Sequence, residues 1–206
     1  MIREATVEAL KAELAGHLRS RTEWDEVPAL FTVHQVGGHG VRMVQVPLPE
    51  IVWTRHGHPP TAVGALAAVA LQLRRCPDGS HMFVTDNGPL IGAAFRYEAH
   101  AIASDSPHPA VQEAARRRTA GGSTPRFEHI PGRIEQRCIT AVDLDGGRYM
   151  ASSNRIDDSK PDAAEPRVLY LAFDDPKRDT LKGNVVEAVN RFLNAIKPAW
   201  TKDDIR

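Results

Sequence analysis

Apolar residues recur at helical spacing in three stretches of the chain. In residues 3–20, Val7, Leu10, Leu14 and Leu18 are separated by polar and charged residues, which predicts an amphipathic helix. A second helix is expected over 61–73, where Pro59 and Pro60 suit a first helical turn. A third should begin at Asp179 or Thr180 and end before Pro198, with apolar residues along one face.

Between these helices the pattern changes to short apolar runs joined by turn residues, which predicts β-hairpins. Gly37–Gly40, Asp86-Asn87-Gly88 and Asp143–Gly147 each provide the turn residues that a hairpin needs. The Gly37–Gly40 segment lacks the spacing and the following helix of a phosphate-binding loop. The expected strands are Leu30 to Val36, Val41 to Leu48, Met82 to Thr85, Leu90 to Ile102, Gly132 to Val142, Arg148 to Ser153 and Val168 to Phe173.

Consecutive hairpins favour an antiparallel sheet, so the predicted fold class is α+β. We expect a single domain over residues 1–206, with one mainly antiparallel sheet of about five to seven strands and helices packed on one face. Residues 103–131 form an irregular insertion in which 110–118 can be a short helix. The order of elements resembles that of profilin-like and roadblock-like domains, at the level of topology alone. Such a resemblance implies a fold and no function.

The composition limits which cellular compartment and which classes of binding partner we expect for this protein. The 26 basic and 26 acidic residues cancel, so the chain has no long-range attraction for nucleic acid or anionic lipid. Cys76 and Cys138 show no metal-type spacing, and we expect two buried, reduced thiols in a cytoplasmic protein. The longest apolar run, 62–73, is too short to cross a bilayer. No cofactor is expected.

The first candidate site lies before the second helix. Trp53, Arg55, His56 and His58 are close together there, and the two histidines point the same way if the segment is extended. With His34 or His39 they could hold zinc, although no carboxylate has a recognised spacing. Arg55 and the helix start could instead bind an anion. The simplest interpretation is a polar loop that leads into a capped helix.

The second candidate is a polar strand face. Arg96, Glu98 and His100 alternate with apolar residues, so all three point to one side of a strand. Glu135 and Arg137 alternate in the same way on a later strand. If the two strands pair, the charges form a cross-strand ladder with a structural role. The alternative is that this polar face of the sheet binds a ligand.

Other charged groups have simpler interpretations. Arg116-Arg117-Arg118, with Arg126 and His129 nearby, could contact phosphates, but cations also suit the last turn of a helix. The acidic pairs fall at expected turns and chain ends, where Asp side chains bind nearby backbone. These pairs are Asp143/Asp145, Asp157/Asp158, Asp174/Asp175 and Asp203/Asp204.

The sequence contains no nucleophile elbow, HExxH, Walker A or complete dinucleotide-binding motif. The leading hypothesis is therefore a non-catalytic binding or regulatory domain that contacts a protein or small ligand and self-associates, for example as a homodimer. The alternative is a hydrolase that uses His56 and His58. The third hypothesis is nucleic-acid binding through Arg116–Arg118.

Overall fold

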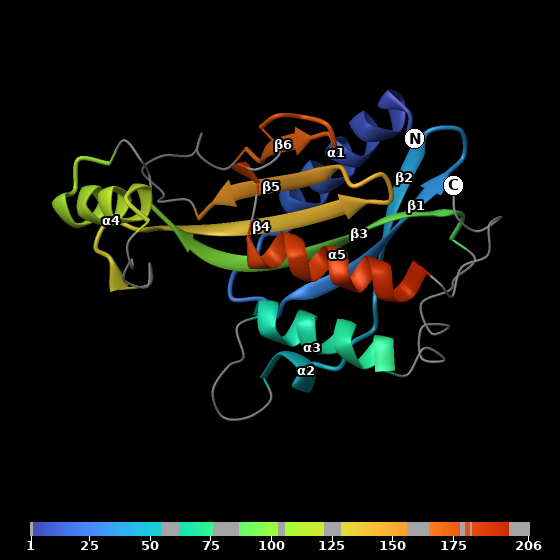
Figure 1. Cartoon of the computed structure of the whole chain (residues 1–206), viewed down its shortest axis with the longest axis horizontal. Helices are drawn as coiled ribbons and strands as arrows, with labels where there is room; N and C mark the ends of the chain where they lie inside the picture. Colours follow the sequence, from blue (N-terminus) through green and yellow to red (C-terminus); the bar gives the residue numbers. More distant parts are fainter. Residues whose placement is uncertain are drawn as a thin grey trace.

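The computed structural model describes residues 2–54, 62–75, 87–102, 106–121, 129–155, 165–177, 180–181 and 183–197. These residues form a six-stranded antiparallel sheet in the order β2-β1-β3-β4-β5-β6 (Figure 1). The α+β class and the single antiparallel sheet are as predicted. The strands are β1 (Ala29–Val36), β2 (Gly40–Gln45), β3 (Leu90–Ala101), β4 (Ile134–Asp143), β5 (Arg148–Asn154) and β6 (Arg167–Leu171).

Two of the three expected hairpins are confirmed. β1 pairs with β2 across the Gly37–Gly40 turn, and β4 pairs with β5 across the turn that begins at Asp143. The strand expected at Met82 to Thr85 lies outside the described residues. The neighbour of β3 on one side is β1, so the chain leaves the edge strand β2, passes through two helices and returns to the middle of the sheet.

One face of the sheet is covered by α3 (Ala62–Arg75) and α5 (Asn184–Ile196), with the short α2 (Ile51–Thr54) beside α3 (Figure 1). This is the helical layer that the periodicity predicted. The side chains that point to this face from β1 and β3 include Leu30, Leu90 and Phe95, and they share one apolar cluster with Leu66 and Phe192. Burial of these side chains supplies much of the free energy of folding.

Helix α1 (Glu4–Arg19) lies on the opposite face and forms a second apolar cluster. Its side chains Val7, Leu10 and Leu14 pack against Phe31 and Ile139. β1 is buried at six successive positions, from Ala29 to His34, because helices cover both of its faces. Periodicity identifies the apolar side of a helix but not the face of the sheet that the helix covers. The position of α1 on the face opposite α3 and α5 is therefore known only from the structure.

The insertion between β3 and β4 contains α4 (Pro109–Thr119), as expected, at the far end of the two longest strands (Figure 1). Val111, Ala114 and Ile130 form a small apolar cluster of their own there. Cys138 on β4 is a buried free thiol, as predicted, whereas Cys76 lies outside the described residues. Within the described ranges, no helix combines the length and apolar character needed to cross a membrane.

The apolar cluster beneath α5 should dominate stability. We expect Phe192→Ala to lower the free energy of unfolding by about 3–5 kcal/mol, because Phe192 is fully buried and its removal leaves a cavity. Leu71→Ala on α3 is the matched control, because Leu71 is 50% exposed and should lose less than about 1 kcal/mol. Urea unfolding of both variants measures the difference. An equal loss in the two variants would contradict this assignment of the core.

Candidate functional site

The structure describes only part of the first predicted site. Trp53 is buried in the cluster beneath α3 and α5, and its ring centroid lies 5.6 Å from that of Phe95. Arg55, His56 and His58 lie outside the described residues. His34 is buried, and its ring nitrogens lie within hydrogen-bond distance of the Gly88 carbonyl (2.8 Å) and the Thr32 hydroxyl (2.9 Å). Trp53 and His34 are thus packed as parts of the fold.

His39 is exposed at the β1–β2 turn. In the part of the chain that the structure describes, no three His, Cys, Asp or Glu side chains are grouped as metal ligands would be.

The second predicted group does come together. Arg96, Glu98 and His100 project from β3 toward the face that α1 covers, beyond the apolar cluster. Glu98 lies opposite Arg137 on β4, and His100 lies opposite Glu135 with 3.8 Å between His100 Nε2 and Glu135 Oε1. The strand pairing that the ladder requires is therefore present.

Residues 21–28, which we call the strap, lead from α1 to β1 without forming a helix or strand. The Trp24 ring lies over the Arg137 guanidinium, 4.6 Å from its central carbon, and 5.4 Å from that of Arg155. Glu26 binds Arg96 at 3.0 Å and also pairs with Arg21. The strap thus covers the charged end of the sheet.

Backbone groups of the strap also bind the ladder. Arg96 Nη2 donates to the Val27 carbonyl at 3.2 Å, and Arg137 Nη1 donates to the Arg21 carbonyl at 2.8 Å. The Asp25 backbone N–H donates to Glu98 Oε2 at 2.9 Å. The sequence analysis assigned no role to the strap, although a tryptophan at position 24 within a polar stretch was an available signal.

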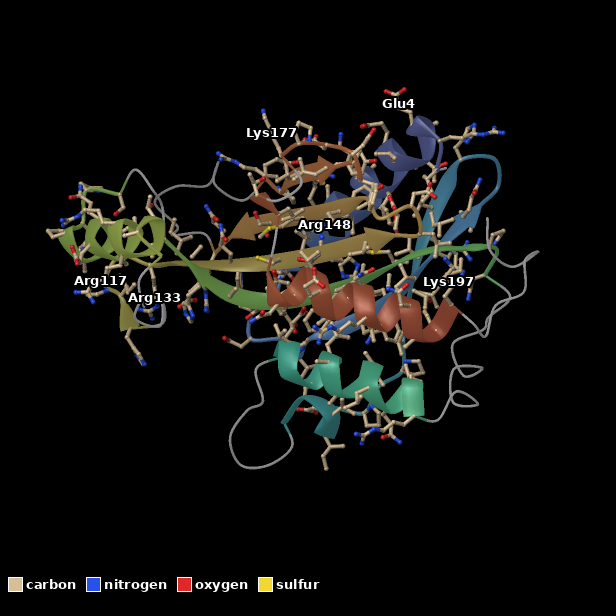
Figure 2. The ribbon with its side chains drawn as sticks, viewed as in Figure 1. Glu4, Arg117, Arg133, Arg148, Lys177 and Lys197 are labelled. Atoms are coloured by element: carbon tan, nitrogen blue, oxygen red, sulfur yellow. The ribbon has the colours of Figure 1, made fainter. Side chains whose placement is uncertain are left out.

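A larger cavity, of about 750 Å³, lies at the other end of the same sheet face. We call it the acidic pocket. Its walls come from the start of α1, the β4–β5 turn and the segment after β6; Figure 2 shows Glu4 at the outer end of α1. The lining residues are Ile2, Glu4, Val7, Glu8, Asp143, Asp145, Gly147, Tyr170, Ala172, Phe173 and Asp174.

Asp143 forms the inner wall of the acidic pocket and also holds the turn. Its carboxylate accepts hydrogen bonds from the backbone N–H groups of Asp145 (2.9 Å) and Gly147 (2.8 Å) and from the Tyr149 hydroxyl (2.8 Å). Burial is the largest influence on this carboxyl and raises its pKa above the usual value. The interpretation of Asp143 as a turn residue is confirmed.

The position after the turn must be a glycine. A Cβ at Gly147 would lie 2.4 Å from Asp143 Oδ2 and 3.0 Å from a ring carbon of Tyr170. Sequence reasoning recognised the turn but not the acidic pocket, because its carboxylates are widely separated in the chain. The two acidic turns at 143–145 and 174–175 were the available signal.

Comparisons of the chain with protein-family models, curated proteins and solved structures found no match. The choice of function therefore depends on these two sites.

Packing at the end of α1 predicts a pH effect on stability. Burial, followed by the charges of Arg96 and Arg21, lowers the pKa of His17 from 6.5 to about 4. The unfolded chain therefore binds more protons between pH 6.5 and pH 4, and the contribution of neutral His17 to stability is lost as pH falls through this range.

Urea unfolding of the wild type and His17→Gln at several pH values measures this contribution. The variant should lose less stability than the wild type between pH 6.5 and 4. His39→Gln, at the exposed turn, should behave like the wild type. Identical pH profiles for wild type and His17→Gln would contradict the assignment.

Proposed function

We propose that this chain is a non-catalytic binding domain that holds a positively charged ligand in the acidic pocket. The observation that carries the proposal is the composition of the lining: five carboxylates and no lysine or arginine among the described residues. The volume of about 750 Å³ lies within the range of small-ligand sites. A pocket of this size can accept a small amine or a basic side chain of a protein partner.

The electrostatics favour a cation. Like charges held near one another raise the free energy of the empty pocket, and a bound cation relieves this repulsion. Lys11 lies nearby on α1, but its ammonium pairs with Glu8 at 2.9 Å and does not line the pocket. Glu4 carries no salt bridge to a described residue.

Aromatic side chains add a site for the apolar part of the ligand. Tyr170 and Phe173 both line the acidic pocket, and Phe173 is 66% exposed. An aromatic face attracts a cation and also packs against methylene groups, so the lining suits an alkylamine or the side chain of lysine or arginine.

The other two hypotheses have less support. His56 and His58, which the hydrolase hypothesis requires, lie outside the described residues. For nucleic-acid binding, Arg116 and Arg117 both form ion pairs with Glu113 on α4, at 2.9 Å and 2.8 Å, which reduces the charge available to phosphates.

Binding of organic cations tests the proposed function. We expect spermidine and a lysine-rich peptide to bind saturably at low salt, as measured by calorimetry, with weaker binding as salt rises. The double variant Glu4→Gln/Asp174→Asn should bind at least about tenfold more weakly, which corresponds to about 1.4 kcal/mol. Glu187→Gln, an exposed carboxylate on α5, is the control. Equal affinity in the double variant and the wild type would contradict the proposal.

Self-association through β6 is a second part of the proposal. β6 is an edge of the sheet, and Leu169 on this strand is 46% exposed. An edge strand with an exposed apolar side chain can pair with the same strand of a second copy.

Light scattering over a range of concentrations tests this pairing. Apparent mass should rise with concentration for the wild type and stay at the monomer value for Leu169→Lys. Leu71→Lys changes a similarly exposed leucine on α3 and should still self-associate. A concentration-independent monomer mass for the wild type, or association that persists in Leu169→Lys, would rule out pairing through β6.

A further inference from the structure

Unsatisfied polar atoms are concentrated at one place in the described part of the molecule. Four buried side-chain nitrogen and oxygen atoms have no hydrogen-bond partner there: His17 Nε2, Glu98 Oε1, and Nε and Nη2 of Arg137. All three residues lie at the strap end of the sheet face beneath α1. Folded proteins leave few such atoms unpaired, so a cluster of them indicates a missing partner.

Arg137 presents a free donor edge. Its side chain is only 2% exposed, and its Nη1 already donates to the Arg21 carbonyl. The unpartnered Nε and Nη2 lie along one edge of the guanidinium, whose parallel N–H groups match an oxygen acceptor in bidentate geometry. A buried guanidinium with unmet donors raises the free energy of the folded state, which a suitable acceptor would lower.

Glu98 presents a free acceptor beside that edge. The backbone N–H of Asp25 in the strap binds its Oε2, whereas Oε1 lies 3.6 Å from Arg137 Nη2, beyond a direct hydrogen bond. A donor edge and an acceptor atom therefore lie side by side as an ion pair, and neither makes a hydrogen bond.

Glu98 lines a small cavity beside this pair, whereas Arg137 is not one of its lining residues. The volume of the cavity is about 160 Å³, and Trp24 forms part of its wall while also lying over Arg137. A ligand in the cavity would reach Arg137 only if the Trp24 ring were displaced, and the strap that carries this ring is not part of the sheet. The other lining residues are Asp25, Glu98, Ala99, His100, Glu135, Gln136 and Arg155.

The local charges decide which ligand fits. Glu26 pairs with Arg96, and Glu135 pairs with Arg155 at 2.7 Å. Asp25, Glu98 and Glu135 line the cavity, and each has the guanidinium of Arg155 or Arg137 within 4 Å, so their negative charges are compensated. A simple anion would meet Glu98 and Glu135, and a simple cation would meet Arg137 and Arg155. A ligand without net charge avoids both repulsions.

We propose that the strap covers a second binding site, which recognises a small neutral group with an oxygen acceptor beside an N–H donor. The oxygen accepts from the Arg137 edge, and the N–H donates to Glu98 Oε1. A primary amide and the zwitterion of a free α-amino acid both have this chemistry. The site lies at the opposite end of α1 from the acidic pocket and does not depend on the function proposed for it.

NMR titration of the whole chain tests this site directly, with the Arg137 Nε–H and Trp24 Nε1–H resonances as reporters. One arm uses a panel of free α-amino acids, and a second uses neutral primary amides such as propionamide. Acetate and methylammonium serve as single-charge probes. We expect saturable shifts of both resonances in at least one of the first two arms, and at least tenfold weaker binding of acetate and methylammonium. The arm that binds identifies the source of the ligand group.

Glu98→Gln is the informative variant because it keeps the side-chain shape and removes the acceptor charge. Binding should weaken at least tenfold, whereas Glu187→Gln on α5, an exposed carboxylate outside both sites, should leave it unchanged. Thermal unfolding of the same samples shows whether Glu98→Gln is folded. If this variant does not fold, Trp24→Ala replaces it in the test. Trp24→Ala removes the ring that covers Arg137 and should therefore change the affinity for the ligand. The proposal is overturned if no amino acid or amide gives a saturable shift. It is also overturned if acetate binds equally well, or if the folded Glu98→Gln binds like the wild type.

Discussion

The pairing of β3 with β4 is the constraint on which both candidate sites depend. These two strands lie at the centre of the sheet and share ten residue pairs, from Gly92 opposite Asp143 to Ala101 opposite Ile134. At one end this register sets Glu98 beside Arg137, and at the other it brings Asp143 to the acidic pocket. A slip of one residue would turn these side chains to the opposite face, into the apolar layer under α3 and α5.

Helix α1 connects the two sites because it lies along the same face. Its first turn carries Glu4 at the acidic pocket, and the chain continues from its last turn into the strap. Between them Leu10 and Leu14 pack on the apolar middle of the sheet. The stable packing is thus in the centre of the helix, and the polar chemistry is at its two ends.

The hairpins and helices could be predicted from the sequence because the patterns that specify them span only a few neighbouring residues. Glycine-rich turns marked the β1–β2 and β4–β5 hairpins, and periodicity marked α1, α3 and α5. The alternation of charges on β3 and β4 indicated a cross-strand ladder if the two strands pair, and the structure sets Glu98 opposite Arg137. A hairpin turn and an alternating strand pattern both specify neighbours within a few residues, so single-sequence reasoning was sufficient for them.

The candidate sites could not be predicted in the same way because they join distant segments. The acidic pocket brings Glu4 and Asp174 together from almost opposite ends of the chain. Trp24 reaches Arg137 only because α1 covers the face from which Arg137 projects, and periodicity did not identify that face. Trp53 is part of the core, and the two histidines near it in the sequence lie outside the described residues.

The net charge of the sequence does not reveal how charged side chains are distributed within the fold. Equal numbers of acidic and basic residues exclude a strong field at long range. They do not prevent carboxylates from gathering at one end of a sheet face while arginines and glutamates alternate at the other. Asp143 lies six positions after Arg137 on β4, which corresponds to roughly 20 Å at about 3.4 Å per residue. The Debye length at physiological salt is about 8 Å, so charges at one site are largely screened from the other. The two sites can therefore bind ligands of different charge on one neutral domain.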